Sequence, residues 1–241
     1  MKIIVTENYN EMSKKAGELV AKIIAAKPDA VMGLATGDTP VGLYNELVSK
    51  NKAGELDFSR VSSVNLDEYY PISPDNDQSY RYFMNEKLFD RINIDKNNTF
   101  VPNGSSADPD EASRAHEAKI DELGGIDIQV LGIGRNGHIG FNEPDEKGLI
   151  ADTHLTALTP DTIDANSRFF ASYDDVPKHA LTMGMGSIFK ARSIVILVSG
   201  ENKKAAVKRM LEGPIDTMCP ASLLCLHNDV TLICDKDAYP Y

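Results

Sequence analysis

Short apolar runs alternate along the chain with longer segments of helical period, and this alternation constrains the fold more than any other feature. The apolar runs have the length of strands, and the segments between them are amphipathic. Such alternation predicts a parallel sheet covered by helices on both faces. We therefore expect an α/β fold with an open, mostly parallel, Rossmann-like sheet. The predicted strands are residues 2–6, 30–36, 61–66, 126–133, 193–199 and 230–234, and the predicted helices are roughly residues 10–26, 40–51, 79–91, 109–122 and 201–212.

The 241 residues contain no internal repeat, no low-complexity tract and no linker rich in Gly, Ser or Pro, so we expect a single domain over residues 1–241. No apolar run approaches the roughly 18 residues that a membrane span needs, and the N-terminus lacks the layout of a signal peptide. A cytoplasmic protein is therefore expected. Cys219, Cys225 and Cys234 match no zinc-binding spacing, so we interpret them as reduced core thiols.

The net charge limits the possible partners. The chain has 25 basic and 36 acidic residues, which gives a formal charge of −11. The resulting field repels nucleic acid and anionic membranes, so neither is an expected partner. Any anionic ligand must instead meet a local cluster of cations.

The first candidate site is the turn Thr36-Gly37-Asp38-Thr39, because ligands of parallel sheets bind beyond the carboxyl ends of the strands. Gly37 allows a tight turn, Thr39 suits an N-cap and Pro40 suits the first helical position. The N–H groups of such a turn, with a helix dipole behind them, favour phosphate. Capped turns are also common without any ligand, and this alternative remains open.

Asp67 is the second candidate, because it follows directly on the predicted strand 61–66. A carboxylate at the carboxyl end of a strand is rigidly held and partly buried, which suits a general base. Side chains alternate along an extended chain, so Glu68 should point the other way. The alternative is that Asp67 caps the next turn.

The predicted strand 126–133 leads into the glycine-rich loop Gly132-Ile133-Gly134-Arg135-Asn136-Gly137. The loop matches the dinucleotide fingerprint G-x-G-x-x-G, but a helix does not follow it, so the context argues against a nucleotide cofactor. What remains is a loop that presents Asn136, His138 and Glu143 together. His138 could titrate near neutrality with Glu143 orienting it, or it could be bonded to backbone in a structural turn.

Two cations are candidates for an anion site. Arg168 precedes Phe169 and Phe170, which indicates a packed guanidinium. Lys203 lies in the first turn of the helix after the predicted strand 193–199, where lysine is normally avoided. For both residues the alternative is a solvated surface position.

Four ordered segments together resemble glucosamine-6-phosphate deaminases, and the similarity runs from about residue 2 to residue 235. The segments are Leu34–Pro40, Asn65–Tyr69, Gly132–Pro144 and Ala165–Phe170. The wider superfamily shares the α/β fold and includes 6-phosphogluconolactonases and the sugar-phosphate-sensing domains of some transcription regulators. The Asp67 and Glu143 segments favour the deaminase over a lactonase-like hydrolase. A non-catalytic regulator would need a DNA-binding segment, which does not precede residue 1, and the acidic charge disfavours one.

The resemblance implies conversion of glucosamine 6-phosphate and water to fructose 6-phosphate and ammonia, with no metal or organic cofactor. We accordingly expect a hydrolase of amino-sugar catabolism. His138, with Asn136 and Glu143, would move the ring-oxygen proton, and Asp67 would carry the C2 proton to C1. The residues that would hold the phosphate are Thr36, Gly37, Asp38, Thr39, Arg168 and Lys203.

Asn136 departs from the family pattern, because many members have an aspartate beside the histidine. An amide can orient an imidazole but adds no negative charge to raise its pKa. We therefore expect a histidine–glutamate pair without a full charge relay.

Regulation is expected to be absent. Relatives activated by N-acetylglucosamine 6-phosphate resemble one another in a basic stretch after the Asn-Glu-Pro motif and in a longer C-terminal tail. Residues 151–156 here offer one carboxylate and a mostly neutral histidine, and the chain stops at Tyr241. We expect hyperbolic kinetics and a monomer, or otherwise a small homo-oligomer such as a dimer.

Overall fold

The computed structural model describes residues 1–167, 170 and 172–241, and its centre is a sheet whose strand pairs are all parallel. The α/β fold with a mostly parallel sheet is therefore confirmed. The spatial order of this sheet is β1 (Lys2–Thr6), β10 (Val230–Asp235), β9 (Ser193–Val198), β6 (Ile128–Leu131), β2 (Val31–Leu34), β3 (Ser62–Asn65) and β5 (Thr99–Phe100).

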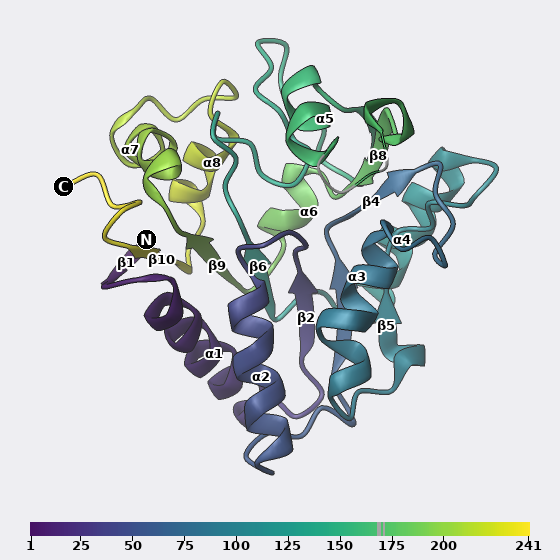
Figure 1. The fold of residues 1–241 in the computed structure, drawn as a ribbon, viewed down its shortest axis with the longest axis vertical. Coiled ribbons are helices and arrows are strands. Elements are labelled where there is room, and N and C mark those ends of the chain that lie inside the picture. Colours follow the sequence, from purple (N-terminus) through teal and green to yellow (C-terminus); the bar gives the residue numbers. More distant parts are fainter. Residues whose placement is uncertain (168–169, 171) are drawn as a thin grey trace.

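Helices cover both faces of the sheet, as the alternation predicts. Figure 1 shows α1 and α2 side by side in front of the strands. The helices on this face are α1 (Tyr9–Ala26), α2 (Val41–Lys52) and α3 (Tyr80–Lys87). Those packed on the other face are α4 (Pro109–Glu122), α6 (Met185–Phe189), α7 (Lys204–Glu212) and α8 (Pro220–Leu223). The remaining elements are α5 (Pro160–Ser167) and the 3-10 turns Phe89–Arg91, Lys96–Asn98, Tyr173–Asp175, Glu201–Lys203 and Leu224–Leu226.

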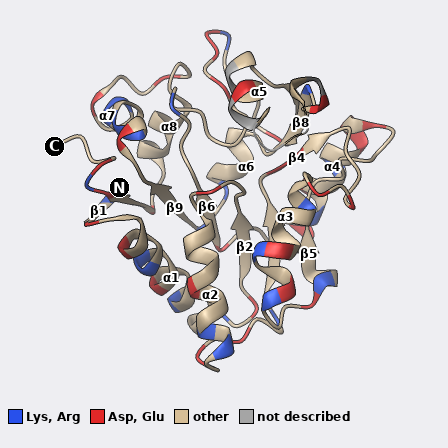
Figure 2. Ribbon diagram, viewed as in Figure 1, with Lys and Arg blue, Asp and Glu red and all other residues tan. Residues whose placement is uncertain are grey.

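Helix α1 forms where an amphipathic pattern meets a capping residue. The side chain of Asn8 accepts a hydrogen bond from the N–H of Glu11 at the start of α1. The helix then buries Met12, Ala16 and Val20 on one side. Charged residues lie along helices such as α1 and α7 and in the loops, whereas β2 and β9 have none (Figure 2). This division is what a sheet buried on both faces requires.

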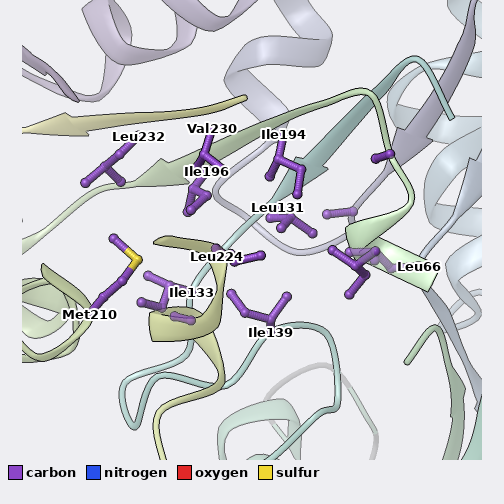
Figure 3. Close-up of a cluster of buried hydrophobic side chains, with 14 of the residues drawn as sticks. Leu66, Leu131, Ile133, Ile139, Ile194, Ile196, Met210, Leu224, Val230 and Leu232 are labelled. Carbon is purple, nitrogen blue, oxygen red and sulfur yellow. The ribbon is translucent and has the colours of Figure 1, made fainter. Parts of the chain in front are cut away.

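The loop at the end of β6 is held by the apolar core. Ile133 and Ile139 flank this loop, and both are buried in the cluster that also contains Ile194 and Leu224 (Figure 3). The core therefore fixes both ends of the segment that carries His138. Close packing of this kind limits side-chain movement.

A second, antiparallel sheet was not predicted. Its order is β4 (Asp67–Tyr70), β8 (His179–Thr182) and β7 (His154–Ala157). The predicted strand 61–66 ends at Asn65, and the chain enters β4 directly after Leu66. The predicted helix 79–91 is also divided, because α3 ends at Lys87 and a 3-10 turn follows.

The three cysteines are free, as expected; Cys219 and Cys234 are buried, but Cys225 is only partly buried.

Among the described residues, no helix is long and apolar enough to cross a membrane. The same part of the chain holds no cluster of three or more His, Cys, Asp or Glu side chains that could bind a metal ion.

The strand order reverses between β2 and β6. From β2 the chain passes to β3 on one side, and β6 later pairs with the other side of β2. The loops after the two strands diverge at this point and leave a crevice, which is where open α/β sheets bind ligands.

Candidate active site

A cavity of about 400 Å³ lies at this crevice and brings together most of the residues singled out in the sequence. The predicted site residues that line it are Thr36, Gly37, Asp38, Thr39, Asp67, Asn136, His138 and Lys203. Glu143 does not line the cavity but contacts His138. Arg168 lies outside the described residues.

Asp67 begins β4 and has a buried side chain. Burial, together with the negative charge of Glu68, raises the pKa of Asp67 to about 8. Among the described residues, no group donates a hydrogen bond to its carboxylate. The loop of residues 132–142 carries His138 and is called the histidine loop below. Gly140 allows this loop to lie close to Asp67, because a Cβ at Gly140 would be 3.5 Å from Asp67 Oδ2. Asp67 is thus a buried carboxylate free to take up a proton, and it does not cap a turn.

The histidine loop is a tight turn. The N–H of Gly134 donates to the carbonyl of His138 at 2.9 Å, and the N–H of Gly137 donates to the carbonyl of Gly134 at 3.0 Å. A Cβ at Gly134 would lie only 2.3 Å from the His138 ring, and Gly137 has a φ of +90°. Both positions therefore require glycine for geometric reasons and not for a nucleotide.

Behind His138, polar side chains hold Glu143 in place. His138 Nδ1 lies 3.2 Å from Glu143 Oε1, Asn136 Nδ2 donates to Glu143 Oε2 at 2.7 Å and Thr162 Oγ1 donates to Glu143 Oε1 at 3.0 Å. Burial alone would raise the pKa of Glu143, but the hydrogen bond and positive charge of His138 and the bonds from Asn136 and Thr162 hold it below its ordinary value. Glu143 therefore remains ionised beside Nδ1, and Nε2 is the ring nitrogen left for a substrate.

Asn136 acts differently from our expectation. Its amide bonds the carboxylate of Glu143 and does not orient the imidazole. Its Oδ1 accepts the backbone N–H of His138 at 3.1 Å. The charge beside the histidine therefore comes from Glu143, and Asn136 fixes the loop and the carboxylate.

The turn after β2 offers backbone N–H groups to the cavity. Gly37 has a φ of +88°, and among the described residues nothing accepts a hydrogen bond from the N–H of Gly37 or Thr39. The predicted start of α2 is one residue early: the helix begins at Val41, and no side chain caps it from Pro40. The hydroxyl of Tyr9 accepts the N–H of Gly42 at 2.7 Å instead. Within the described part of the chain, unpaired N–H groups therefore face the cavity from this turn.

Two cations lie at the edge of the cavity. Lys203 Nζ donates to the carbonyl of Ile133 at 2.8 Å, which joins the turn before α7 to the histidine loop. Burial and the neighbouring charge of Arg135 lower the pKa of Lys203. Arg135 also lines the cavity, and among the described residues it has no carboxylate partner. Like charges placed together in this way favour a bound anion.

Sequence reasoning did not identify Arg135 or Thr162 as parts of the site. It also missed a group of aromatic residues that line the cavity, called the aromatic wall below: Tyr69, Tyr80, Phe141 and Phe170. The rings of Tyr69 and Tyr80 have centroids 4.7 Å apart, Phe141 stacks on Tyr80 at 6.4 Å, and Phe170 meets Tyr69 edge-on at 5.6 Å. A signal existed for Tyr69, because alternation along an extended chain places it on the same side as Asp67.

Comparison with known proteins gives a consistent result. The family model for glucosamine-6-phosphate isomerases and 6-phosphogluconolactonases matches residues 6–233. A glucosamine-6-phosphate deaminase of Clostridium perfringens is 57% identical over 99% of this chain and 98% of its own length. One from Clostridioides difficile is 52% identical over 99% of this chain and 95% of its own length.

Solved structures agree with this fold. A monomeric glucosamine-6-phosphate deaminase superposes with a TM-score of 0.94 at 45% identity, covering 99% of this chain and 98% of that chain. A 6-phosphogluconolactonase from Thermotoga maritima has a TM-score of 0.76 at 20% identity, covering 98% of this chain and 99% of that chain. The likeness to the lactonase is one of fold alone.

Proposed function

Because the chain belongs to the family of glucosamine-6-phosphate isomerases and 6-phosphogluconolactonases, we propose that it is a glucosamine-6-phosphate deaminase. It converts glucosamine 6-phosphate and water to fructose 6-phosphate and ammonia. High identity to deaminases over nearly the whole chain supports this substrate over a lactone. The observation that carries the proposal is the shared cavity, in which Asp67, free of hydrogen-bond donors among the described residues, and the His138–Glu143 pair both lie.

The first step is opening of the sugar ring. His138 transfers the proton between the C1 hydroxyl and the ring oxygen, which yields the open-chain aldehyde. Glu143 contacts Nδ1 at 3.2 Å and stabilises the positive charge that the ring acquires while it holds the proton. Asn136 and Thr162 keep Glu143 in this position.

Asp67 carries out the isomerisation. Its carboxylate takes the proton from C2, which the neighbouring aldehyde makes acidic, and an enolamine forms. The protonated Asp67 then delivers a proton to C1, which leaves an imine at C2. Water adds to C2 and ammonia departs, so that fructose 6-phosphate results. A single carboxylate placed beside both carbons can act as the base at C2 and as the acid at C1, and the proton that it holds can exchange with water between the two transfers.

The phosphate binds at the other end of the cavity. The N–H groups of Gly37 and Thr39 and the ammonium of Lys203 are its main partners, and Arg135 adds a second positive charge at this edge. Arg168 is assigned to the same role from the family resemblance. Binding energy from this remote group holds C1 and C2 at Asp67.

The reaction class is isomerisation coupled to deamination. The expected label of hydrolase is not supported by the comparisons. The protein acts on a small sugar phosphate in the cytoplasm as a monomer or small homo-oligomer. It requires no metal or organic cofactor.

The test is a pair of assays on the same preparation, one for ammonia release from glucosamine 6-phosphate and one for hydrolysis of 6-phosphogluconolactone. We expect ammonia and fructose 6-phosphate in equal amounts from the first assay. Activity only on the lactone would overturn the proposal.

A further inference from the structure

Glu68 is a buried carboxylate that the chemistry above leaves unused. Its side chain is 1% exposed and lies on the opposite side of β4 from Asp67, as alternation predicts. Asp67 lines the large cavity, whereas Glu68 lines a smaller one of about 200 Å³ that it shares with Arg81. A buried charge is costly unless it has hydrogen-bond or ion-pair partners, so the partners of Glu68 indicate the role of this residue.

Those partners are backbone N–H groups on two elements. Oε1 accepts from the N–H of Tyr69 at 2.9 Å and from that of Tyr80 at 2.8 Å, and Oε2 accepts from the N–H of Arg81 at 2.9 Å. Tyr80 and Arg81 are the first two residues of α3. One carboxylate thus ties the strand that begins with Asp67 to the N-terminus of a helix.

The same contact fixes the wall of the active-site cavity. Tyr80 lines the cavity, and its ring packs against Tyr69 and stacks on Phe141. The Arg81 guanidinium is turned away and bonds Thr99 at its side-chain and backbone oxygens, each at 2.8 Å. Movement of Glu68 would therefore shift both the wall and the base.

Glu68 also acts on Asp67 through its charge. Burial raises the pKa of Glu68 to about 7. The three N–H donors and the positive charge of Arg81 act in the opposite direction and lower this pKa. Its negative charge is the second cause, after burial, of the raised pKa of Asp67. The other titratable groups that interact with the two carboxylates are the phenols of Tyr44, Tyr69 and Tyr80 and the Arg81 guanidinium. Of these, only Arg81 adds a formal charge at neutral pH.

We propose that Glu68 is a positioning residue for the deamination reaction: it holds Asp67 in register with the aromatic wall. This inference rests on the function proposed above. A purely structural role, in which Glu68 only caps α3, would affect stability and leave catalysis unchanged.

The test compares Glu68→Gln with wild type and with a matched control. Glu117→Gln is the control, because Glu117 also accepts three hydrogen bonds, from the Thr153 N–H and hydroxyl and from the Ser187 hydroxyl, but does not line the active-site cavity. Glu68→Gln is expected to lose about tenfold in kcat with little change in KM, since a small displacement of a catalytic group is costly. The acid limb of its kcat–pH profile should move to lower pH, because removal of a like charge lowers the pKa of Asp67. Glu117→Gln should change neither.

Glu68→Asp separates the effect of side-chain length from the effect of charge. It is also the variant to measure if Glu68→Gln does not fold. It keeps the charge but is one methylene too short to bond both helix N–H groups. We expect a reduced kcat with an acid limb close to that of wild type. Wild-type kcat in Glu68→Asp, or wild-type kcat and pH profile in a folded Glu68→Gln, would overturn the inference. Failure of the wild-type enzyme to release ammonia would instead overturn the proposed function.

Discussion

His138 Nδ1 lies 3.2 Å from Glu143 Oε1, and the other carboxylate oxygen of Glu143 accepts the amide of Asn136. A neutral side chain therefore holds the carboxylate of Glu143 in place beside the imidazole. Thr162, from α5, supplies a second hydrogen bond to Glu143. In the proposed mechanism, ring opening depends on Glu143 for charge and on its neighbours for geometry.

Replacement of Glu143 by Gln should lower kcat on glucosamine 6-phosphate by at least about tenfold, because the amide cannot stabilise a protonated His138. Steady-state ammonia release measures the effect. Glu146→Gln is the matched control, since Glu146 is exposed in the same segment. Wild-type kcat in Glu143→Gln would show that His138 works without the carboxylate.

Substitutions in the proposed phosphate site should affect substrate binding more than the chemical steps. Arg168→Ala and Lys203→Ala should mainly raise KM for glucosamine 6-phosphate, with the larger effect at Arg168, because a guanidinium can bind phosphate bidentately. Weak activity on unphosphorylated glucosamine should barely change. Lys208→Ala is the control, because Lys208 is exposed on α7 and pairs with Glu212 at 3.9 Å. Equal losses on both substrates would assign these cations a structural role.

Asp67 should make stability depend on pH. Its pKa is about 8 in the folded chain against an ordinary value of 3.8. Between these values the unfolded chain has released a proton that the folded chain retains, so this group lowers stability progressively as pH rises from about 4 to about 8. Asp67→Asn removes the effect.

The difference in Tm between Asp67→Asn and wild type should therefore be larger at pH 8 than at pH 5, in favour of the variant. Calorimetry at the two pH values measures it. Asp75→Asn, at an exposed carboxylate of the loop after β4, should change Tm little at either pH. A difference that is equal at both pH values would contradict the raised pKa.

The parallel sheet could be predicted because its strands are apolar runs with clear ends. The range 2–6 was predicted for β1 and is what the structure shows, and β9 is a continuous apolar run after Ser193. β4 could not be recognised, because Asp67 and Glu68 occupy half of it and it is stabilised by pairing with β8. Long-range pairing of this kind leaves no local pattern.

The site shows the same division. The residues at strand ends, such as Asp67 and His138, could be found because topology brings those ends together. Thr162 and Arg135 could not be found from the sequence. Thr162, on α5, contacts Glu143 only in the folded chain, and the loop that carries Arg135 contacts Lys203 only there. The capping function of Tyr9 for α2 is likewise a contact between distant segments.

Regulation by N-acetylglucosamine 6-phosphate is predicted to be absent. Within residues 151–156, the carboxylate of Asp152 lies 3.8 Å from the ammonium of Lys190, so this cation already faces a carboxylate. An anion would meet no net positive charge there, and without a second site no coupling free energy arises. Rate curves should be hyperbolic, and the compound should act only as a weak competitor. Sigmoidal curves that become hyperbolic on its addition would contradict this.

The central claim is that Asp67 carries the proton from C2 to C1 of an amino-sugar phosphate. The most direct test is the reaction of glucosamine 6-phosphate in D₂O, with deuterium at C1 of fructose 6-phosphate followed by NMR in the wild type and in Asp67→Asn. We expect the wild type to form fructose 6-phosphate with C1 exchange. Asp67→Asn should lose both this exchange and at least about 10²-fold in kcat, with little change in KM. Exchange at a near wild-type rate in Asp67→Asn would show that another group transfers the proton.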